Sequence, residues 1–135
     1  MEYVTDAHSL LWHLYRPQRL GRAAQQAFSA TESGQGCIHI LAVVIAEALM
    51  VVQKGRLPGV DLSRLLPHIQ SMNHSRNYSL LSLTPVTVIA SHQYVLIPDI
   101  FDRLIVTESI LLGFPLLTKD PIIPDSGLVS VIWDQ

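Results

Sequence analysis

The sequence has one cysteine and no apolar run of the length that a membrane span requires. Cys37 has no second thiol to pair with, which excludes an internal disulfide and is compatible with a reducing cytoplasm. The apolar stretch around Glu47 falls short of the roughly 18 to 20 residues that cross a bilayer. The N-terminus, "MEYVTDAHSL", lacks the basic segment ahead of an apolar run that marks a signal peptide. We therefore expect a cytoplasmic chain without disulfides.

Positive charge and familiar catalytic motifs are also sparse. Nine Lys and Arg against eleven Asp and Glu give a net charge of −2, which argues against general nucleic-acid binding through phosphate neutralisation. No nucleophile elbow, P-loop or dinucleotide fingerprint is present. His8 and His13 miss the i, i+4 spacing of a helical metal-ligand pair. A protein with this net charge can still bind nucleic acid locally, if several acidic side chains together hold a cation. The positions of the acids therefore matter more than their number.

Apolar residues are plentiful: 49% of the chain is hydrophobic, and the mean hydropathy is +0.33. A chain of 135 residues can bury most of its apolar surface around one core, so residues 1–135 are expected to form a single domain. The sequence shows no internal repeat, low-complexity tract or linker. The apolar excess predicts either an unusually apolar core or an apolar partner surface.

Short strand patterns alternate with helical patterns along the chain. Strands are predicted at residues 3–5, 37–40, 78–83, 114–118 and 128–133, with a short turn between the last two. Helices are predicted at residues 7–15, 20–33, 42–54, 61–72, 98–113 and, after a Thr84 cap, from Pro85 onward. Asp61 and Asp99 are expected N-caps, and Gly113 is an expected helix stop. This alternation predicts an α/β fold with a parallel sheet covered on both faces.

Four acids lie near the edge at which parallel sheets bind ligands. Asp6 comes directly after the first predicted strand, and Asp120 follows the fourth. Glu47 lies early in the helix after the second strand, and Asp102 lies in the first turn of the last long helix. Apolar residues three and four positions away place both helical carboxylates on apolar faces. We therefore expect the four acids to converge on one site.

Each acid also has a structural alternative. Asp6 can cap the helix that follows it, Asp102 can be a polar residue favoured by the helix dipole, and Asp120 can cap the turn "DPIIPD". Glu47 has no capping role in the middle of a helix. Burying a lone carboxylate costs several kcal/mol unless a partner compensates. A compensating partner for Glu47 is therefore expected.

Four converging carboxylates repel one another unless a cation intervenes. Hard oxygen ligands suit Mg²⁺ or Mn²⁺, which also bind phosphate oxygens. A metal ion held in this way polarises a phosphodiester and lowers the pKa of a bound water. The residues themselves thus predict a metal-assisted phosphate-ester hydrolase, whose metal ligands and catalytic residues are Asp6, Glu47, Asp102 and Asp120.

At these residues the sequence resembles a known family over nearly its whole length. The stretches "YVTDAHSLLWHL", "VVIAEALMVVQKGRL", "IPDIFDRLIVTESILLGFPLLTKD" and "VSVIWD" are similar to successive motifs of PIN-domain ribonucleases, in particular the VapC-like toxins of type II toxin-antitoxin pairs. The family's acidic quartet falls on Asp6, Glu47, Asp102 and Asp120. The resemblance implies a three-layer α/β/α domain with a short, mainly parallel central sheet. It also implies a Mg²⁺- or Mn²⁺-dependent endoribonuclease that cleaves single-stranded RNA, leaving 5'-phosphate and 3'-hydroxyl ends.

Four more residues are candidates for supporting roles. Thr118 occupies the position at which the family commonly has a hydroxyl that supports the site. Asp99 is either a simple N-cap or an outer carboxylate that orients a metal-bound water. Arg103 and Lys119, each beside a predicted ligand, either contact RNA phosphate or offset the acidic cluster.

The resemblance also suggests partners: a second copy in a homodimer, and a small antitoxin protein that places an apolar segment in a groove. Three helices, at residues 7–15, 21–32 and 42–54, are expected to supply this surface through Leu10, Leu11, Trp12, Leu14, Leu49 and Val52. The alternative function is a catalytically inactive PIN-like module that binds RNA or protein. A phosphate-accepting receiver domain is disfavoured, because "YVTDAH" offers one acid where a receiver needs a pair.

Overall fold

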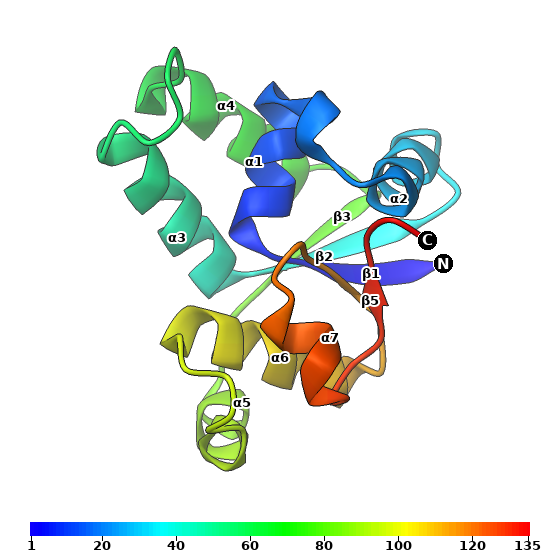
Figure 1. The fold of residues 1–135 in the computed structure, drawn as a ribbon. Coiled ribbons are helices and arrows are strands. Elements are labelled where there is room, and N and C mark those ends of the chain that lie inside the picture. Colours follow the sequence, from blue (N-terminus) through cyan, green and yellow to red (C-terminus); the bar gives the residue numbers. More distant parts are fainter.

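The computed structural model describes residues 1–135 and contains one sheet of five parallel strands (Figure 1). The strands are β1 (Glu2–Thr5), β2 (Cys37–Leu41), β3 (Tyr78–Leu81), β4 (Leu116–Leu117) and β5 (Val131–Ile132). Their order in the sheet is β3-β2-β1-β4-β5, so the direction of strand order reverses between β1 and β4. The predicted parallel sheet is confirmed, and its switch point lies where β1 and β4 end.

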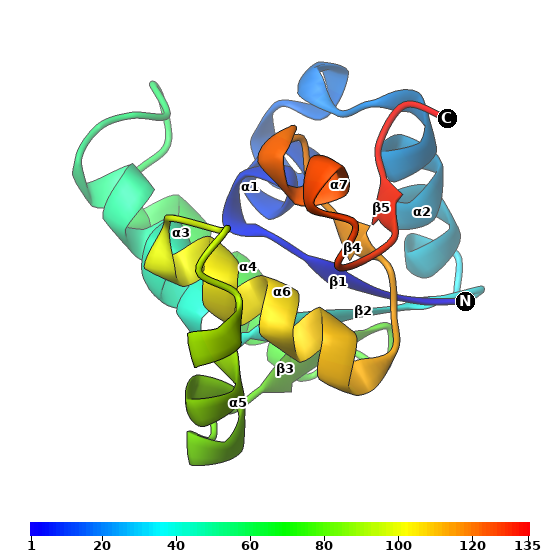
Figure 2. The same ribbon diagram turned by 60° about the horizontal axis from the view of Figure 1, so that its bottom comes forward.

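Helices cover both faces of the sheet. They are α1 (Ala7–Tyr15), α2 (Arg22–Glu32), α3 (Ala42–Gln53), α4 (Leu62–Asn73), α5 (Pro85–Ala90), α6 (Ile100–Leu112) and α7 (Ile122–Ser126), with short 3-10 helices η1 (Pro17–Arg19) and η2 (Ser91–Gln93). Figure 1 shows α1, α2 and α4 on one side of the sheet and α6 and α7 on the other. Figure 2 shows α6 lying in front of the sheet. The three-layer α/β/α architecture is thus confirmed. No helix combines the length and the apolar character that crossing a bilayer requires.

The short turn predicted between the last two strands is wrong, because α7 lies between β4 and β5. Parallel strands need a crossover connection, and a tight turn cannot supply one. Pro121 is the N-cap residue of α7, and Pro124 lies in the first turn, where a helix needs no backbone N–H. Gly127 ends the helix with a φ of 71°. The prolines that suggested a turn therefore begin a helix.

The predicted ends of α6 are confirmed. The Asp99 carboxylate accepts a hydrogen bond from the Asp102 N–H at 3.0 Å, and Gly113 ends the helix with a φ of 75°. The predicted N-cap of α4, Asp61, is confirmed as well, and α4 continues through Pro67. The placement of α6 matters for function, because α6 contacts both β1 and α3.

The hydrophobic core fills the space between the sheet and the helices and holds the strand ends in place. Burying a Leu, Ile or Phe side chain contributes roughly 1.5–3 kcal/mol. The largest fully buried side chains are Phe28, Leu10, Leu11, Ile38, Ile40, Leu41, Leu65, Ile97, Ile105, Leu116, Leu117 and Ile123.

The apolar partner surface predicted on the early helices is wrong for three of its six residues. Leu10, Leu11 and Val52 belong to the core, and Trp12, Leu14 and Leu49 pack partly buried against it. The exposed apolar side chains lie mainly on α5, after η2 and at the start of α6; they include Val86, Val88, Ile89, Val95, Leu96 and Ile100. Which apolar face of a helix is buried depends on its tertiary neighbours, and helical periodicity does not specify them.

Candidate active site at the carboxyl edge of the sheet

A cavity of about 480 Å³ lies where β1 and β4 end, at the switch point of the sheet. Its lining residues are Asp6, His8, Trp12, Glu47, Asp99, Asp102, Lys119, Asp120 and Pro121. All four acids predicted as ligands, and Asp99 with them, therefore line one cavity. Their convergence is a structural observation, whereas their metal-binding and catalytic roles stay predictions.

Asp6 is the most deeply buried of the five acids. It follows β1 and caps α1: one carboxylate oxygen accepts from the Ser9 N–H at 2.8 Å, and the other accepts from the Thr118 hydroxyl at 2.6 Å. Burial raises the pKa of Asp6, although the hydrogen bonds from Thr118 and Ser9 act in the opposite direction. The capping alternative and the site prediction are thus compatible, because the capped carboxylate still lines the cavity.

Glu47 and Asp102 come from α3 and α6, two helices that contact each other. Burial raises the pKa of Asp102 to about 7, and the neighbouring acids of the cavity add to the shift. Burial also raises the pKa of Glu47; Asp6 and Asp99 contribute, and His8 acts against them. The chain's two ion pairs, His13 with Glu32 and His39 with Glu2, leave both carboxylates without a basic partner. Glu47 therefore has no ion-pair partner in this protein, although His8 in the same cavity favours its charged form.

Asp99 and Asp120 combine backbone capping with a position in the cavity. The Asp99 carboxylate caps α6, as predicted, and also lines the cavity. One Asp120 oxygen accepts from the Ile122 N–H at 3.0 Å, and the Asp120 N–H donates to the Thr118 hydroxyl at 3.2 Å. Hydrogen bonds to nearby backbone N–H groups hold the carboxylates of Asp99 and Asp120 in position. The local fold therefore sets where the two carboxylates lie in the cavity.

The two basic candidates, Lys119 and Arg103, lie in different places in the structure. Lys119 lines the cavity, and its Nζ lies 5.6 Å from the centroid of the Trp12 ring, a cation–π distance. Arg103 does not line the cavity; its Nε donates to the carbonyl of Ile97 at 2.9 Å. Lys119 is therefore the basic side chain that is placed to meet an anionic ligand.

Sequence reasoning missed His8 and Trp12 as lining residues. In the sequence, His8 and His13 miss the spacing of a helical metal-ligand pair, and Trp12 is expected on a partner surface. Both lie on α1 directly after Asp6, and their rings are 5.8 Å apart between centroids. Their i, i+4 spacing puts them on one helix face, and that spacing next to a strand-end acid is the signal that identifies them.

The donor set of the cavity fits Mg²⁺ or Mn²⁺, because all five acids offer hard oxygen ligands and lack an ion-pair partner. The acids are spaced more widely than in a closed metal site. No three of them bring oxygens within 4.8 Å of one another, a spacing that only Glu2, Cys37 and His39 reach. Such spacing suits an ion that keeps several of its waters, as Mg²⁺ does.

The structure predicts that Thr118 stabilises the site. Thr118→Val keeps the shape but removes the hydroxyl that donates to Asp6 and accepts from the backbone of Asp120. Because Asp6 is buried, we expect the free energy of unfolding, measured by urea titration, to fall by about 1–3 kcal/mol. Thr107→Val is the matched control, since the Thr107 hydroxyl donates only to the Arg103 carbonyl of its own helix. Equal losses in the two variants would contradict a special role for Thr118.

Comparisons with known proteins establish the fold. Searches for a matching family model and for a curated relative by sequence found none. The structure of VapBC2 from Rickettsia felis, bound to a DNA fragment from its promoter, matches with a TM-score of 0.70 and 14% identity, over 99% of this chain and 100% of that one. PAE2754 from Pyrobaculum aerophilum matches with a TM-score of 0.60 and 15% identity, over 97% of this chain and 83% of that one. The chain therefore shares its fold with these two proteins over nearly its whole length, as the resemblance to VapC-like PIN domains implies.

Proposed function

We propose that this chain is a divalent-metal-dependent endoribonuclease that hydrolyses phosphodiester bonds of single-stranded RNA. One observation carries the proposal: five acids without an ion-pair partner meet in one cavity at the switch point of the sheet. The VapC-like fold supports a nuclease, and the sequence motifs support RNA as its substrate. Residues 1–135 would act as one catalytic domain.

The residues proposed to hold one or two Mg²⁺ or Mn²⁺ ions are Asp6, Glu47, Asp102 and Asp120. When bound, the metal would lower the pKa of a water and stabilise the charge that develops on the phosphate. The raised pKa values support this role. Burial raises the pKa of Asp6, Glu47 and Asp102, neighbouring acids add to the rise at Glu47 and Asp102, and a bound cation would favour the charged carboxylates. The expected products carry 5'-phosphate and 3'-hydroxyl ends.

Other residues of the chain would position the substrate and the acids. The Thr118 hydroxyl holds one oxygen of Asp6. Lys119 brings a positive charge into the cavity, where it would bind an RNA phosphate, and the Trp12 ring beside it limits its motion. Asp99 places a further carboxylate near Asp102, from which it would orient a water.

We also propose that the protein is a cytoplasmic toxin of a toxin-antitoxin pair and forms a homodimer. VapBC2 of Rickettsia felis, to which the fold is similar, was solved bound to its promoter DNA. The exposed apolar residues of α5, the segment after η2 and the start of α6 are the surface available for a partner. A large apolar patch on a small domain is a common mark of a protein interface.

Cleavage assays on end-labelled RNA test the proposal. With Mg²⁺ or Mn²⁺ the protein should cut a single-stranded RNA and leave a duplex of the same sequence intact, and the products should carry 5'-phosphates. Excess EDTA should abolish cleavage, and renewed Mn²⁺ should restore it. Cleavage that persists in EDTA would refute the metal mechanism.

The wide spacing of the acids favours one alternative, a PIN-like module that binds RNA or protein without cutting. The same assay separates the two functions. An inactive module would retard the labelled RNA in a gel, or leave it free, and would yield no product at any metal concentration. Product formation that follows the Mn²⁺ concentration would exclude the alternative.

A further inference from the structure

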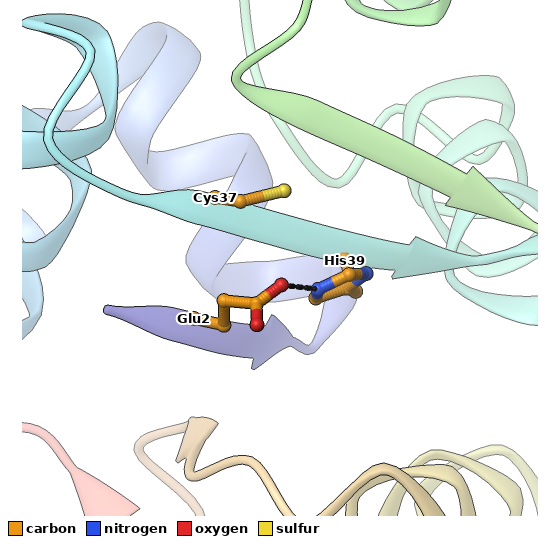
Figure 3. Close-up of side chains that lie close together, drawn as sticks. All are labelled: Glu2, Cys37 and His39. Carbon is orange, nitrogen blue, oxygen red and sulfur yellow. Dashed lines mark hydrogen bonds and ion pairs between the residues drawn. The ribbon is translucent and has the colours of Figure 1, made fainter.

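A second cluster of metal-ligating side chains lies away from the acidic cavity, toward the amino ends of β1 and β2. Glu2 begins β1, and Cys37 and His39 lie two residues apart on β2. Glu2 is in register with Cys37, and Val4 with His39. Side chains two positions apart on a strand share a face of the sheet, as do register partners on neighbouring strands. The three side chains therefore meet on one face (Figure 3).

The ligand atoms of this cluster lie close enough together to hold one metal ion. Each of the three residues offers one ligand atom, and these atoms all lie within 4.8 Å of one another. The positions of the side chains are set by the pairing of two strands in the sheet, so folding itself assembles the group. None of these three residues lines the acidic cavity.

His39 presents its Nε2 to the cluster. Its Nε2 pairs with a Glu2 carboxylate oxygen at 2.9 Å, and its ring stacks on Phe114 with centroids 5.1 Å apart. Its Nδ1, however, is buried and has no hydrogen-bond partner. Buried polar atoms nearly always have a partner in folded proteins. The nitrogen that is placed to bind a metal together with Glu2 is therefore Nε2, while Nδ1 points away from Glu2 and Cys37 (Figure 3).

We propose that Glu2, Cys37 and His39 bind a Zn²⁺ ion. A thiolate, an imidazole nitrogen and a carboxylate are the ligands that Zn²⁺ prefers, whereas Mg²⁺ and Mn²⁺ prefer all-oxygen sites such as the acidic cavity. Three protein ligands leave a fourth position for water or for a partner's side chain. Binding releases the thiol proton of Cys37 to solvent and replaces the hydrogen bond between Glu2 and His39. The ion would join β1 to β2.

Co²⁺ is the probe that reports this site selectively. A Co²⁺ ion bound to a thiolate gives a charge-transfer absorption in the near ultraviolet, whereas Co²⁺ among carboxylates does not. Chelator-treated full-length protein should bind one thiolate-coordinated Co²⁺ per chain, and Zn²⁺ should displace it. Cys37→Ser should abolish the band, and Glu2→Gln or His39→Asn should weaken binding by at least about tenfold. Asp102→Asn, on the acidic cavity, is the control that should leave the band unchanged.

Thiol labelling provides a second readout that needs no variant. Cys37 is the sole cysteine of the chain, so an alkylating reagent reports this site alone. Stoichiometric Zn²⁺ should slow the labelling at least about tenfold, and Mg²⁺ should have no effect. Equal labelling rates with and without Zn²⁺, or a Co²⁺ spectrum without the thiolate band, would overturn the proposal and leave Glu2 and His39 as a simple ion pair. Because neither readout depends on RNA cleavage, a failure here leaves the proposed nuclease function untouched.

Discussion

Replacing Asp102 by Asn is expected to lower metal-dependent RNA cleavage by more than about 100-fold, because loss of an outer-shell partner of a metal ligand already costs roughly 10- to 100-fold. Asn keeps the shape of the side chain but removes a negative ligand. Asp102 is a cleaner target than Asp6, whose carboxylate also caps α1 and binds the Thr118 hydroxyl. The loss should appear in the initial rate of product formation at saturating Mn²⁺.

Asp125→Asn is the matched control for this experiment. Asp125 is an exposed carboxylate on α7 that does not line the cavity, so the change in net charge is the same while the site stays intact. We expect Asp125→Asn to cleave at the wild-type rate. If Asp102→Asn cleaves as fast as this control, the assignment of the site is wrong even if the fold is right.

The acids could be found from the sequence because their positions depend on local features. Asp6 follows a short strand, and in a parallel sheet the end of that strand is a ligand-binding edge. Asp102 is placed by α6, whose two ends are marked by the Asp99 cap and by Gly113. Strand ends and helix caps are encoded within a few residues, so a single sequence is enough to locate them.

Features that depend on long-range pairing could not be found in this way. Glu2 and His39 are far apart in the chain, and they meet only because β1 and β2 pair in one particular register. The exposed apolar side chains of α5 are another example, because helical periodicity does not say which face meets the sheet. The α7 helix was missed because the prolines in "DPIIPD" favour a turn and a first helical turn equally well.

The structure also answers why Glu47 interrupts an apolar helix. Its carboxylate is partly buried and lines the cavity, where burial and, to a smaller extent, Asp6 and Asp99 raise its pKa. No basic side chain forms an ion pair with Glu47, and the opposing effect of His8 does not cancel the rise in its pKa. Without metal the acidic cavity is therefore a source of instability, and the proposed metal would relieve it. This conclusion can be tested without any activity assay.

The metal-free protein is expected to lose stability as the pH rises from about 4 to about 7. Asp102 has a pKa of about 7 in the folded state, against a usual value of 3.8. Below both values the carboxyl is protonated in both states and has no effect. Between them the unfolded chain releases a proton that the folded protein keeps, so the free energy of unfolding falls. The fall is at most about 4 kcal/mol, and because the cavity is open to water we expect about 1–3 kcal/mol.

Urea titrations in chelator at several pH values from about 4 to about 7.5 would measure this fall. Asp102→Asn should reduce the pH dependence and should be more stable than wild type at neutral pH, because the amide carries no charge. Glu47→Gln should change stability in the same direction by a smaller amount, and Asp125→Asn should behave as wild type. Adding Mn²⁺ at neutral pH should raise the stability of the wild-type protein but should leave that of Asp102→Asn unchanged. If Asp102→Asn is instead less stable than wild type in chelator at neutral pH, Asp102 has a structural partner, and the cavity is not a cluster of repelling acids awaiting a cation.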